Sequence, residues 1–316
     1  MAPNPEAELA IFDLAPARRA EFLGLMRAVY GQAMSEDEFD WFFERNPAGG
    51  RILSAVEDGG QLAGVLAMSF ARAVVEGREE LIAFAVHAVT HPRTRGRGIF
   101  SALELRNEQR AAEAGASLAL GFTNPMAGPI LVGKLGWSDL YRMRLWARVL
   151  RPLRALRRRG GGGLPPSRGG TFTRFDPVQE EAWRRELGRW GNCLVRDTAH
   201  LNWRYVETPK DYRRFASAKG YAVVGHAIHK GVSAAVICDL VGPAREARSL
   251  LRRCLREARG GADVAIGVPA PGQRTAYLSL GFVPTPVTIR VIGKPLRPDA
   301  RLPERWHFAP GDTDIF

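Results

Sequence analysis

The sequence contains an internal repeat, in which landmarks of the first half return in the same order in the second half. Segment 39–47 places a Trp six residues before a Pro, and segment 201–209 does the same. Farther along, the Lys-Leu-Gly-Trp of 134–137 matches the Ser-Leu-Gly-Phe of 279–282. Such self-similarity predicts two copies of one folding unit, and a chain of 316 residues is long enough to hold both.

Hydrophobic periodicity predicts the same elements between these landmarks in both halves. In the first half it predicts strands over 52–57, 62–70, 81–90, 117–122 and 141–149, and helices over 99–114 and 128–135. In the second half it predicts strands over 214–218, 222–229, 232–240 and 263–268, and helices over 244–259 and 272–280. The predicted fold class is therefore α/β (mixed α+β), with two tandem domains, each a mixed twisted sheet flanked by helices.

Segment 151–170 separates the halves and combines arginines, four consecutive glycines and a Pro-Pro pair. Such a composition does not sustain a packed element, so it predicts a linker. The expected domains are 1–150 and 171–296, followed by a C-terminal tail over 297–316. The basic stretch 142–159 fits a weak peripheral contact with a membrane surface, although a solvated tether explains the same charges.

The net charge of +12 favours anionic ligands. Only five of the 45 basic residues are lysines, and the arginines are spread over the whole chain. Because no aromatic motif accompanies the charge, nucleic acid is not the expected partner. The three cysteines, Cys193, Cys238 and Cys254, form no CxxC pair. We therefore expect no disulfide framework, no metal site and a cytoplasmic location.

The most informative motif lies where the predicted strand 81–90 runs into the helix starting at 99, through the letters VTHPRTRGRGIFSAL of 89–103. Glycines let the backbone approach an anion, and the helix start adds N–H groups and a positive dipole end. The spacing matches neither GxxxxGK[ST] nor GxGxxG. The turn predicts a pyrophosphate site, and the alternative is a glycine-rich turn without a ligand. The candidate residues are Val89, Thr90, Arg95, Gly96, Arg97, Gly98, Ile99, Phe100 and Ser101.

This motif resembles the acyl-CoA-binding turn of the GNAT acyltransferase superfamily, [QR]-x-x-G-x-[GA]. Residues 95–100 fill it with Phe100 in the place of the final small residue, and 93–98 fit the letters in a second register. Helix phase favours the first register. Asn124 is similar to the family's pantetheine-contacting asparagine, and 134–137 to its k-l-G-F signature. The resemblance spans about 11–149, and 171–293 more loosely. It implies acetyl-CoA, or another acyl-CoA, as the cofactor.

The second copy lacks the features of this turn. Its equivalent segment, 241–247, has one glycine, a proline that removes an N–H donor, and a glutamate that repels phosphate. We expect the second domain to bind no cofactor.

Many GNAT enzymes use a Glu as base and a Tyr as acid, and the matching positions here hold Ala83 and Val132. Strand alternation places His87 on the face of Ala83, so His87 is the candidate base. The alternative is a structural histidine. Residues expected to line the acceptor site are Trp41, Arg45, Trp203 and Arg204.

The resemblance implies a tandem GNAT N-acetyltransferase that moves an acetyl group from acetyl-CoA to an amine by direct attack. The acceptor is a small-molecule or peptide amine, and the protein is a monomer or a homodimer. Three alternatives remain open. They are a long-chain acyl-CoA transferase at a membrane surface, a non-catalytic acyl-CoA sensor and a Fem-type aminoacyl transferase, which would not need the glycine turn.

Overall fold

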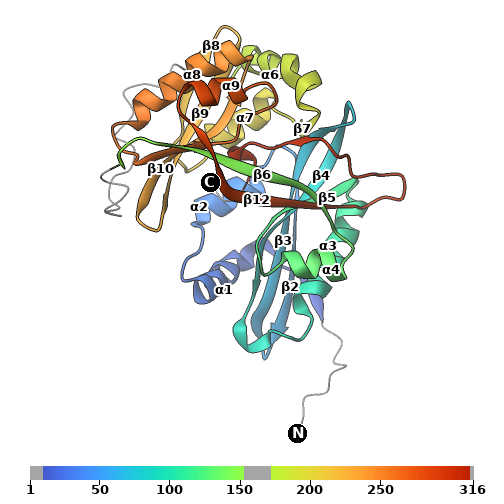
Figure 1. Ribbon diagram of the computed structural model, residues 1–316. Coiled ribbons are helices and arrows are strands. Elements are labelled where there is room, and N and C mark those ends of the chain that lie inside the picture. Colours follow the sequence, from blue (N-terminus) through green and yellow to red (C-terminus); the bar gives the residue numbers. More distant parts are fainter. Residues whose placement is uncertain (1–9, 153–171, 314–316) are drawn as a thin grey trace. The chain divides into compact units, whose positions relative to one another are not determined.

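The computed structural model describes residues 10–152 and 172–313, which form two compact units (Figure 1). Unit 1 comprises Met1–Arg72, Glu80–Leu140 and Val291–Leu302. Unit 2 comprises Ala73–Glu79, Tyr141–Arg290 and Pro303–Phe316. Most of the predicted linker, 153–170, and the last three residues of the tail lie outside the described residues.

The units differ from the predicted domains 1–150 and 171–296 at three places. Residues 73–79 and 141–150 were expected in the first domain and belong to unit 2, and residues 291–296 were expected in the second and belong to unit 1. The reason is strand length, because β6 (Ser138–Val149) and β12 (Val283–Pro295) each contribute residues to both units. Periodicity shows where a strand runs, but not which core it joins.

Unit 1 is a mixed sheet with α1 and α2 on one face and α3 and α4 on the other (Figure 1). Its strands follow the order β1 (Ile11–Asp13), β2 (Arg51–Asp58), β3 (Gln61–Val75), β4 (Arg78–Thr90), β5 (Leu118–Thr123) and the end of β12. Its helices are η1 (Pro16–Arg18), α1 (Arg19–Tyr30), α2 (Glu36–Phe39), η2 (Asp40–Glu44), η3 (Pro92–Thr94), α3 (Ile99–Glu113) and α4 (Gly128–Lys134). The strands β1, β2 and β3 pair antiparallel, and β4 and β5 pair parallel.

The strands and helices predicted for both halves are confirmed, with ends that shift by a few residues. The Asp58-Gly59-Gly60 turn joins β2 to β3 with φ of 60° and 74° at its glycines, the left-handed geometry that favours glycine in a tight hairpin. Periodicity did not predict β1, α1, α6 (Pro177–Trp190) or β12. Within the described part of the chain, no helix has the length and apolar character that crossing a membrane requires.

Helix α3 lies directly on the sheet because Gly64 of β3 has no side chain. A Cβ atom there would lie 2.6 Å from Cγ2 of Ile99, the first residue of α3. The buried side of the helix continues through Leu103 and Ala111, which pack with Ile52, Leu66 and Met68 of the sheet. The position of the helix start is therefore fixed by a contact that only glycine permits.

The buried side of α3 also carries two carboxylates in different settings. Glu108 accepts hydrogen bonds from Trp137 Nε1 at 2.7 Å and from Lys294 Nζ at 2.5 Å. Glu104 is fully buried, and within the described residues neither of its carboxylate oxygens has a hydrogen-bond partner. Burial, together with the negative charge of Glu108, raises the pKa of Glu104 to about 8, against the weaker opposing effect of Lys294.

Unit 2 repeats this arrangement with a second set of elements. Its strands follow the order β12, β6, β11 (Val264–Gly267), β10 (Val232–Val241), β9 (Gly220–His229) and β8 (Arg213–Ser217). Its helices are α6, α7 (Thr198–Tyr205), α8 (Ala244–Ala258), α9 (Arg274–Ser279) and η4 (Pro310–Asp312), and it also contains the short strands β7 (Asn192–Leu194) and β13 (Trp306–His307). One core lies under α8 and α9 and another under α6 and α7. Strands β8, β9 and β10 pair antiparallel in sequence order, and β10 pairs parallel with β11. This reproduces the order of β2–β5 in unit 1, so the duplication extends to topology.

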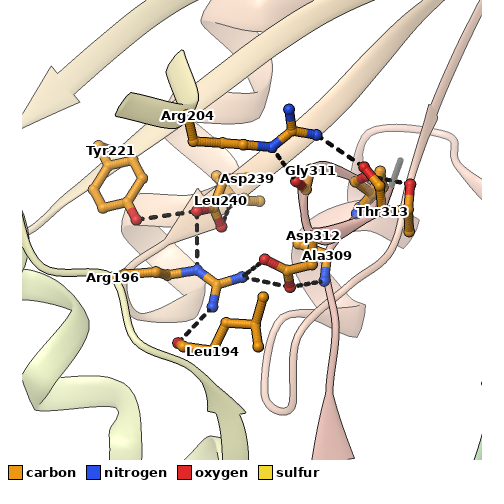
Figure 2. Close-up of polar contacts among 11 residues, drawn as sticks. Leu194, Arg196, Arg204, Tyr221, Asp239, Leu240, Ala309, Gly311, Asp312 and Thr313 are labelled. Carbon is orange, nitrogen blue, oxygen red and sulfur yellow. Dashed lines mark hydrogen bonds and ion pairs between the residues drawn. The ribbon is translucent and has the colours of Figure 1, made fainter. Parts of the chain in front are cut away.

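The C-terminal segment is held inside unit 2 by a buried ionic cluster (Figure 2). Arg196 donates from Nε to Asp239 at 2.9 Å and from Nη2 to Asp312 at 2.8 Å. Tyr221 donates its hydroxyl to the same Asp239 oxygen at 3.1 Å. The three charged side chains of this cluster are at most 2% exposed. Two carboxylates face one guanidinium in a dry setting, so removal of any one of the three groups leaves a buried charge less well compensated.

We expect Asp312→Asn to destabilise the protein by about 3 kcal/mol, because it leaves a buried guanidinium with one carboxylate in place of two. Urea unfolding of the variant measures the loss. The control is Asp299→Asn, at an aspartate whose side chain is 78% exposed, and it should change stability by less than about 0.5 kcal/mol. Equal stability of wild type and Asp312→Asn would show that the cluster does not hold the segment.

A second prediction concerns Glu104. The raised pKa means that the folded state keeps this proton while the unfolded state has lost it, so stability falls as pH rises from about 4.5 to about 8. Glu104→Gln has no proton to lose, so its advantage over wild type should grow across that window by about 1.4 kcal/mol per pH unit.

Urea unfolding at pH 5.5 and at pH 8 measures this difference. The control is Glu113→Gln, at an exposed residue of the same helix. Its stability relative to wild type should be the same at both pH values. A Glu104→Gln advantage that does not change with pH would contradict a neutral Glu104.

Candidate functional site

Strand β4 contains a left-handed residue, His87, with a φ of 47°. Such a conformation costs a non-glycine residue about 1 kcal/mol or more and persists only where its surroundings hold it. It breaks the predicted alternation of side chains. Ala83, Ala85 and also Ala88 pack toward the core of α3, so the series no longer continues through residue 87.

The ring of His87 lies against two phenylalanines. Its centroid is 5.5 Å from that of Phe42 and 5.9 Å from that of Phe43, both edge-on. These rings come from η2, a short π-helical turn that continues α2, and Trp41 of the same turn is buried against Phe42. His87 therefore meets the helices of the first half, and Arg45, which ends η2, is exposed.

Tyr30, the last residue of α1, also reaches β4. Its hydroxyl donates a hydrogen bond of 2.5 Å to the carbonyl oxygen of Ala88, and the side chain remains 53% exposed. The helix ends here because Gly31 adopts a φ of 74° as its C-cap. Burial raises the pKa of Tyr30, and the nearby charge of Arg95 opposes the shift.

The turn after β4 places glycines at the start of α3. Gly96 and Gly98 have φ of 81° and 75°, and in the described part of the chain no heavy atom beyond their sequence neighbours lies within 4 Å of where a Cβ would stand on either. The first hydrogen bond along the helix runs from Ala102 N–H to the Gly98 carbonyl at 3.0 Å. The N–H groups of 99–101 therefore precede the helical ladder and point out of its end.

Thr94 fixes this turn to the sheet. Its side chain is buried and donates to the carbonyl of Ala63 at 3.2 Å, while His91 N–H donates to the same carbonyl at 2.8 Å. His91 also accepts from Arg93 N–H through Nδ1 at 3.2 Å, so His91 has a structural place in the turn.

The arginines of the turn are exposed and only partly neutralised. Arg97 pairs with Asp58 of the β2–β3 turn at 2.9 Å, and the hydrogen bond from Arg97 lowers the pKa of that carboxyl. Arg93 donates to Gln61 at 3.0 Å. One carboxylate therefore faces three arginines, Arg93, Arg95 and Arg97, and the turn keeps a positive field.

The residues that open α3 divide between core and surface. Ile99 is buried against Gly64. The ring of Phe100 is partly buried, because it packs against the hydrophobic clusters under α3 and α4. Ser101 is half-buried. Because Phe100 packs toward the core, it leaves the glycine side of the turn open. The helix start at Ile99 supports the register 95–100.

Asn124 follows β5 and starts the turn into α4. Its Oδ1 accepts from the N–H groups of Met126 and Ala127 at 2.9 and 3.0 Å. The side-chain oxygen thus holds the turn that precedes α4, and the NH2 group is the part of Asn124 that a ligand can use. Just after the other end of α4, Gly136 has a φ of 75°, the left-handed conformation in which many helices end.

Lys294 is the part of unit 1 that sequence reasoning missed most clearly. Besides Glu108, its ammonium donates to the carbonyl of Leu135 at 2.8 Å, at the end of α4. It therefore ties α3 to α4. No local signal near residue 294 indicates this role, because its partners are more than 150 positions away in the sequence.

In unit 2 the equivalent turn is filled with protein atoms. A Cβ on Gly242 would lie 3.0 Å from the carbonyl oxygen of Lys219, and Gln273 donates to the carbonyls of Leu240 and Gly242 at 3.2 and 3.0 Å. The matching Tyr277 is buried in the core, where burial raises its pKa. These contacts give a physical reason for the expectation that the second copy binds no cofactor.

Two of the four expected acceptor residues are buried in unit 2. Arg204 donates from Nε to the carbonyl of Gly311 at 2.7 Å and from Nη2 to that of Thr313 at 2.8 Å (Figure 2). Trp203 is buried, and its ring is tilted against that of His200, with the ring centroids 5.6 Å apart. Their packing gives both residues a structural place in unit 2.

The arrangement in unit 1 combines three chemical capacities. The start of α3 presents N–H groups and arginine charge, which suit an anion. His87 places an imidazole against η2, and Tyr30 has a phenol at the same strand. One strand and the turn that follows it therefore combine groups suited to an anionic carrier and to proton transfer.

Comparisons with known proteins agree with this geometry. Residues 13–139 match the family described as acetyltransferase (GNAT) domain. No curated protein matches the chain. Solved structures with a similar fold include a GCN5-related N-acetyltransferase from Anabaena variabilis, with 14% identity, 92% of this chain and 73% of that chain covered, and a TM-score of 0.65.

Two further structures share the fold. A GCN5-related N-acetyltransferase from Kribbella flavida has 16% identity, 91% and 71% coverage and a TM-score of 0.63. Eis1 from Mycobacterium abscessus has 17% identity, 90% and 73% coverage and a TM-score of 0.58. These matches cover both units at the level of the fold. Residues 13–139 thus match the GNAT acetyltransferase domain, and the chain shares the fold of solved GCN5-related N-acetyltransferases.

Proposed function

We propose that the protein is an acyl-CoA-dependent N-acyltransferase, in its simplest form an N-acetyltransferase that moves an acetyl group from acetyl-CoA to the amine of a small molecule or peptide. Unit 1 binds the cofactor, and unit 2 does not. The observation that carries the proposal is the open glycine turn at the start of α3, with its outward N–H groups and arginines.

The residues of this turn fit a pyrophosphate. Gly96 and Gly98 leave open space where any other residue would place a Cβ, so an anion can approach the backbone closely. The N–H groups of 99–101 lack helical partners by position. The equivalent turn of unit 2 has neither property, which provides an internal comparison for the assignment.

Each residue has a distinct part in the proposed reaction. Acyl-CoA, when bound, supplies an activated thioester. The backbone of 95–101 holds the pyrophosphate, Val89 and Thr90 orient the pantetheine along the edge of β4, and the NH2 group of Asn124 adds a polar contact. His87 removes a proton from the attacking amine, since an imidazole exchanges protons near neutral pH.

The acceptor site is the least specified part of the proposal. Trp41 belongs to η2, the turn that contacts His87, and Arg45 is its C-cap, so both are candidates on that ground. A long-chain donor at a membrane surface is the second candidate, through the basic stretch 142–159. Within it Arg142 and Arg144 are exposed on β6, and 153–159 lie outside the described residues.

The first test measures binding to CoA by calorimetry. We expect one site in the micromolar range that is lost in Gly98→Asp, because a carboxylate at the turn repels the pyrophosphate. Gly98→Asn is the matched control, since Asn and Asp have the same shape and both tolerate a left-handed backbone. It should retain most of the affinity, so the difference isolates charge.

Acetyl-CoA and palmitoyl-CoA are titrated in parallel, and the tighter donor decides between the two candidate functions. Binding without turnover on any amine would identify a sensor instead of an enzyme. Absence of binding to all three compounds would contradict the cofactor site itself.

The second test addresses His87. His87→Asn removes the base but keeps a residue type that tolerates the left-handed φ. We expect kcat to fall about 100-fold or more, with loss of the acidic limb of the pH–rate profile near neutrality. His91→Asn, at the other histidine of this strand end, should keep that limb. An unchanged profile in His87→Asn would exclude His87 as the base.

A further inference from the structure

We propose that Tyr30 donates the proton that the departing CoA thiolate takes up. This inference rests on the proposed function and adds to it a residue that neither the turn motif nor the strand pattern singles out. It assigns the acid of the reaction to the end of α1, in place of the helix α4 position where Val132 stands.

The position of the Tyr30 hydroxyl carries the argument. It donates to the carbonyl of Ala88, one residue after His87 and one before Val89. The N–H of His91 donates to Ala63 of β3, so the backbone of residue 91 faces β3. Successive residues of a strand direct their polar groups to alternate edges. The Ala88 carbonyl, three residues earlier, therefore faces the opposite edge, toward β5.

That edge is where the proposed cofactor path runs. The β4–β5 register pairs Ile82, Ala83 and Phe84 with residues 118–120, so Ala88 lies beyond these pairs on the same edge. Val89 and Thr90 follow at once and lead into the anion-binding turn. The Tyr30 phenol thus lies between the candidate base and the phosphate site, along the line the pantetheine would take.

The composition of unit 1 leaves few other donors. Tyr30 is its one tyrosine, and the three cysteines of the chain all belong to unit 2. Lys294 is committed to Glu108 and the Leu135 carbonyl, and His91 Nδ1 is engaged in the turn. Tyr30 is 53% exposed, so it remains accessible to a ligand at the strand edge.

The electrostatic setting of Tyr30 suits a donor. Its pKa is raised above the usual value of a phenol by burial, so the hydroxyl stays protonated throughout the neutral range. Arg95, whose charge opposes that shift, stabilises the phenolate when it forms. The Tyr30 hydroxyl therefore keeps its proton before the reaction, and the charge of Arg95 favours release of that proton during it.

Transfer of the Tyr30 proton accompanies transfer of the acyl group. The acceptor nitrogen forms a bond with the acyl carbon, and the bond between that carbon and sulfur breaks, with its electron pair going to sulfur. The Tyr30 proton moves to the sulfur and yields CoA thiol. The phenolate then regains the proton that the attacking nitrogen has lost, through His87 or water, so the enzyme returns to its starting state.

The decisive test needs no acceptor. Affinities of CoA and of desulfo-CoA are measured by calorimetry from pH 6.5 to 9.5 on wild type, Tyr30→Phe and Tyr277→Phe. A phenol that donates to sulfur stabilises the thiolate, so in wild type the affinity for CoA relative to desulfo-CoA should rise about tenfold as the bound thiol ionises. Tyr30→Phe should lose this rise.

Tyr277→Phe is the matched control, because it removes a buried hydroxyl that has no hydrogen-bond partner among the described residues, and it should behave as wild type. Equal curves for wild type and Tyr30→Phe would overturn the inference while leaving the cofactor site intact. Failure of wild type to bind CoA at all would instead contradict the proposed function, so the two failures are distinguishable.

Turnover provides a second readout. Tyr30→Phe should lower kcat about 100-fold with the KM for acetyl-CoA changed by less than about threefold. Site-specific 3-fluorotyrosine at position 30, a more acidic phenol, should restore kcat and move the basic limb of the pH profile to lower pH. A basic limb that does not move would overturn the inference, and this variant tests it even if Tyr30→Phe folds poorly.

Discussion

The close contact between Gly64 and Ile99 is the constraint on which the candidate site depends. It lets the first turn of α3 lie on β3 without an intervening side chain. Thr94 then ties the preceding turn to Ala63, the neighbour of Gly64. Because both anchors are on one strand, the two open glycines between them are held in place by packing, and not by the ligand. An anion site built in this way is preorganised, so little ordering remains to be done on binding.

Much of the fold and part of the site were accessible from the sequence. The repeated landmarks, the strand patterns and the glycine turn gave the duplicated α/β topology and the start of α3 at Ile99. These features are local, since each depends on residues a few positions apart. The glycine turn ahead of α3 was also identifiable, and its alternating glycines and arginines are the basis of the proposed anion site.

Three features of the site are not local and were missed. Alternation placed His87 on the face of Ala83, but a left-handed φ inside β4 breaks the pattern, and nothing in the letters around residue 87 marks it. Tyr30 and Ala88 meet only because α1 crosses the sheet. Lys294 reaches Glu108 from the far end of the chain. Arg204, expected at the acceptor site, is buried on the C-terminal segment, since a long polar side chain satisfies backbone carbonyls as readily as it binds a ligand.

The two units show one topology under different demands. In unit 1 the turn between β4 and α3 is open, and charged side chains lie next to it. In unit 2 the same turn is closed by Lys219 and Gln273, and the charges lie instead in the dry cluster around Arg196. This contrast fits the proposal that only the turn of unit 1 binds the cofactor, since functional sites carry local costs that structural regions need not bear.

The assignment of Val291–Leu302 to unit 1 has a consequence for biosynthesis. Gly293 fits closely among Leu120, Leu140 and Leu302, and Lys294 closes the link between α3 and α4. Domains usually fold in the order in which the ribosome releases them. Here unit 1 lacks a strand until residues 141–290 of unit 2 have been translated. Unit 1 is therefore completed only after most of unit 2 has been made, although most of its own residues are made first.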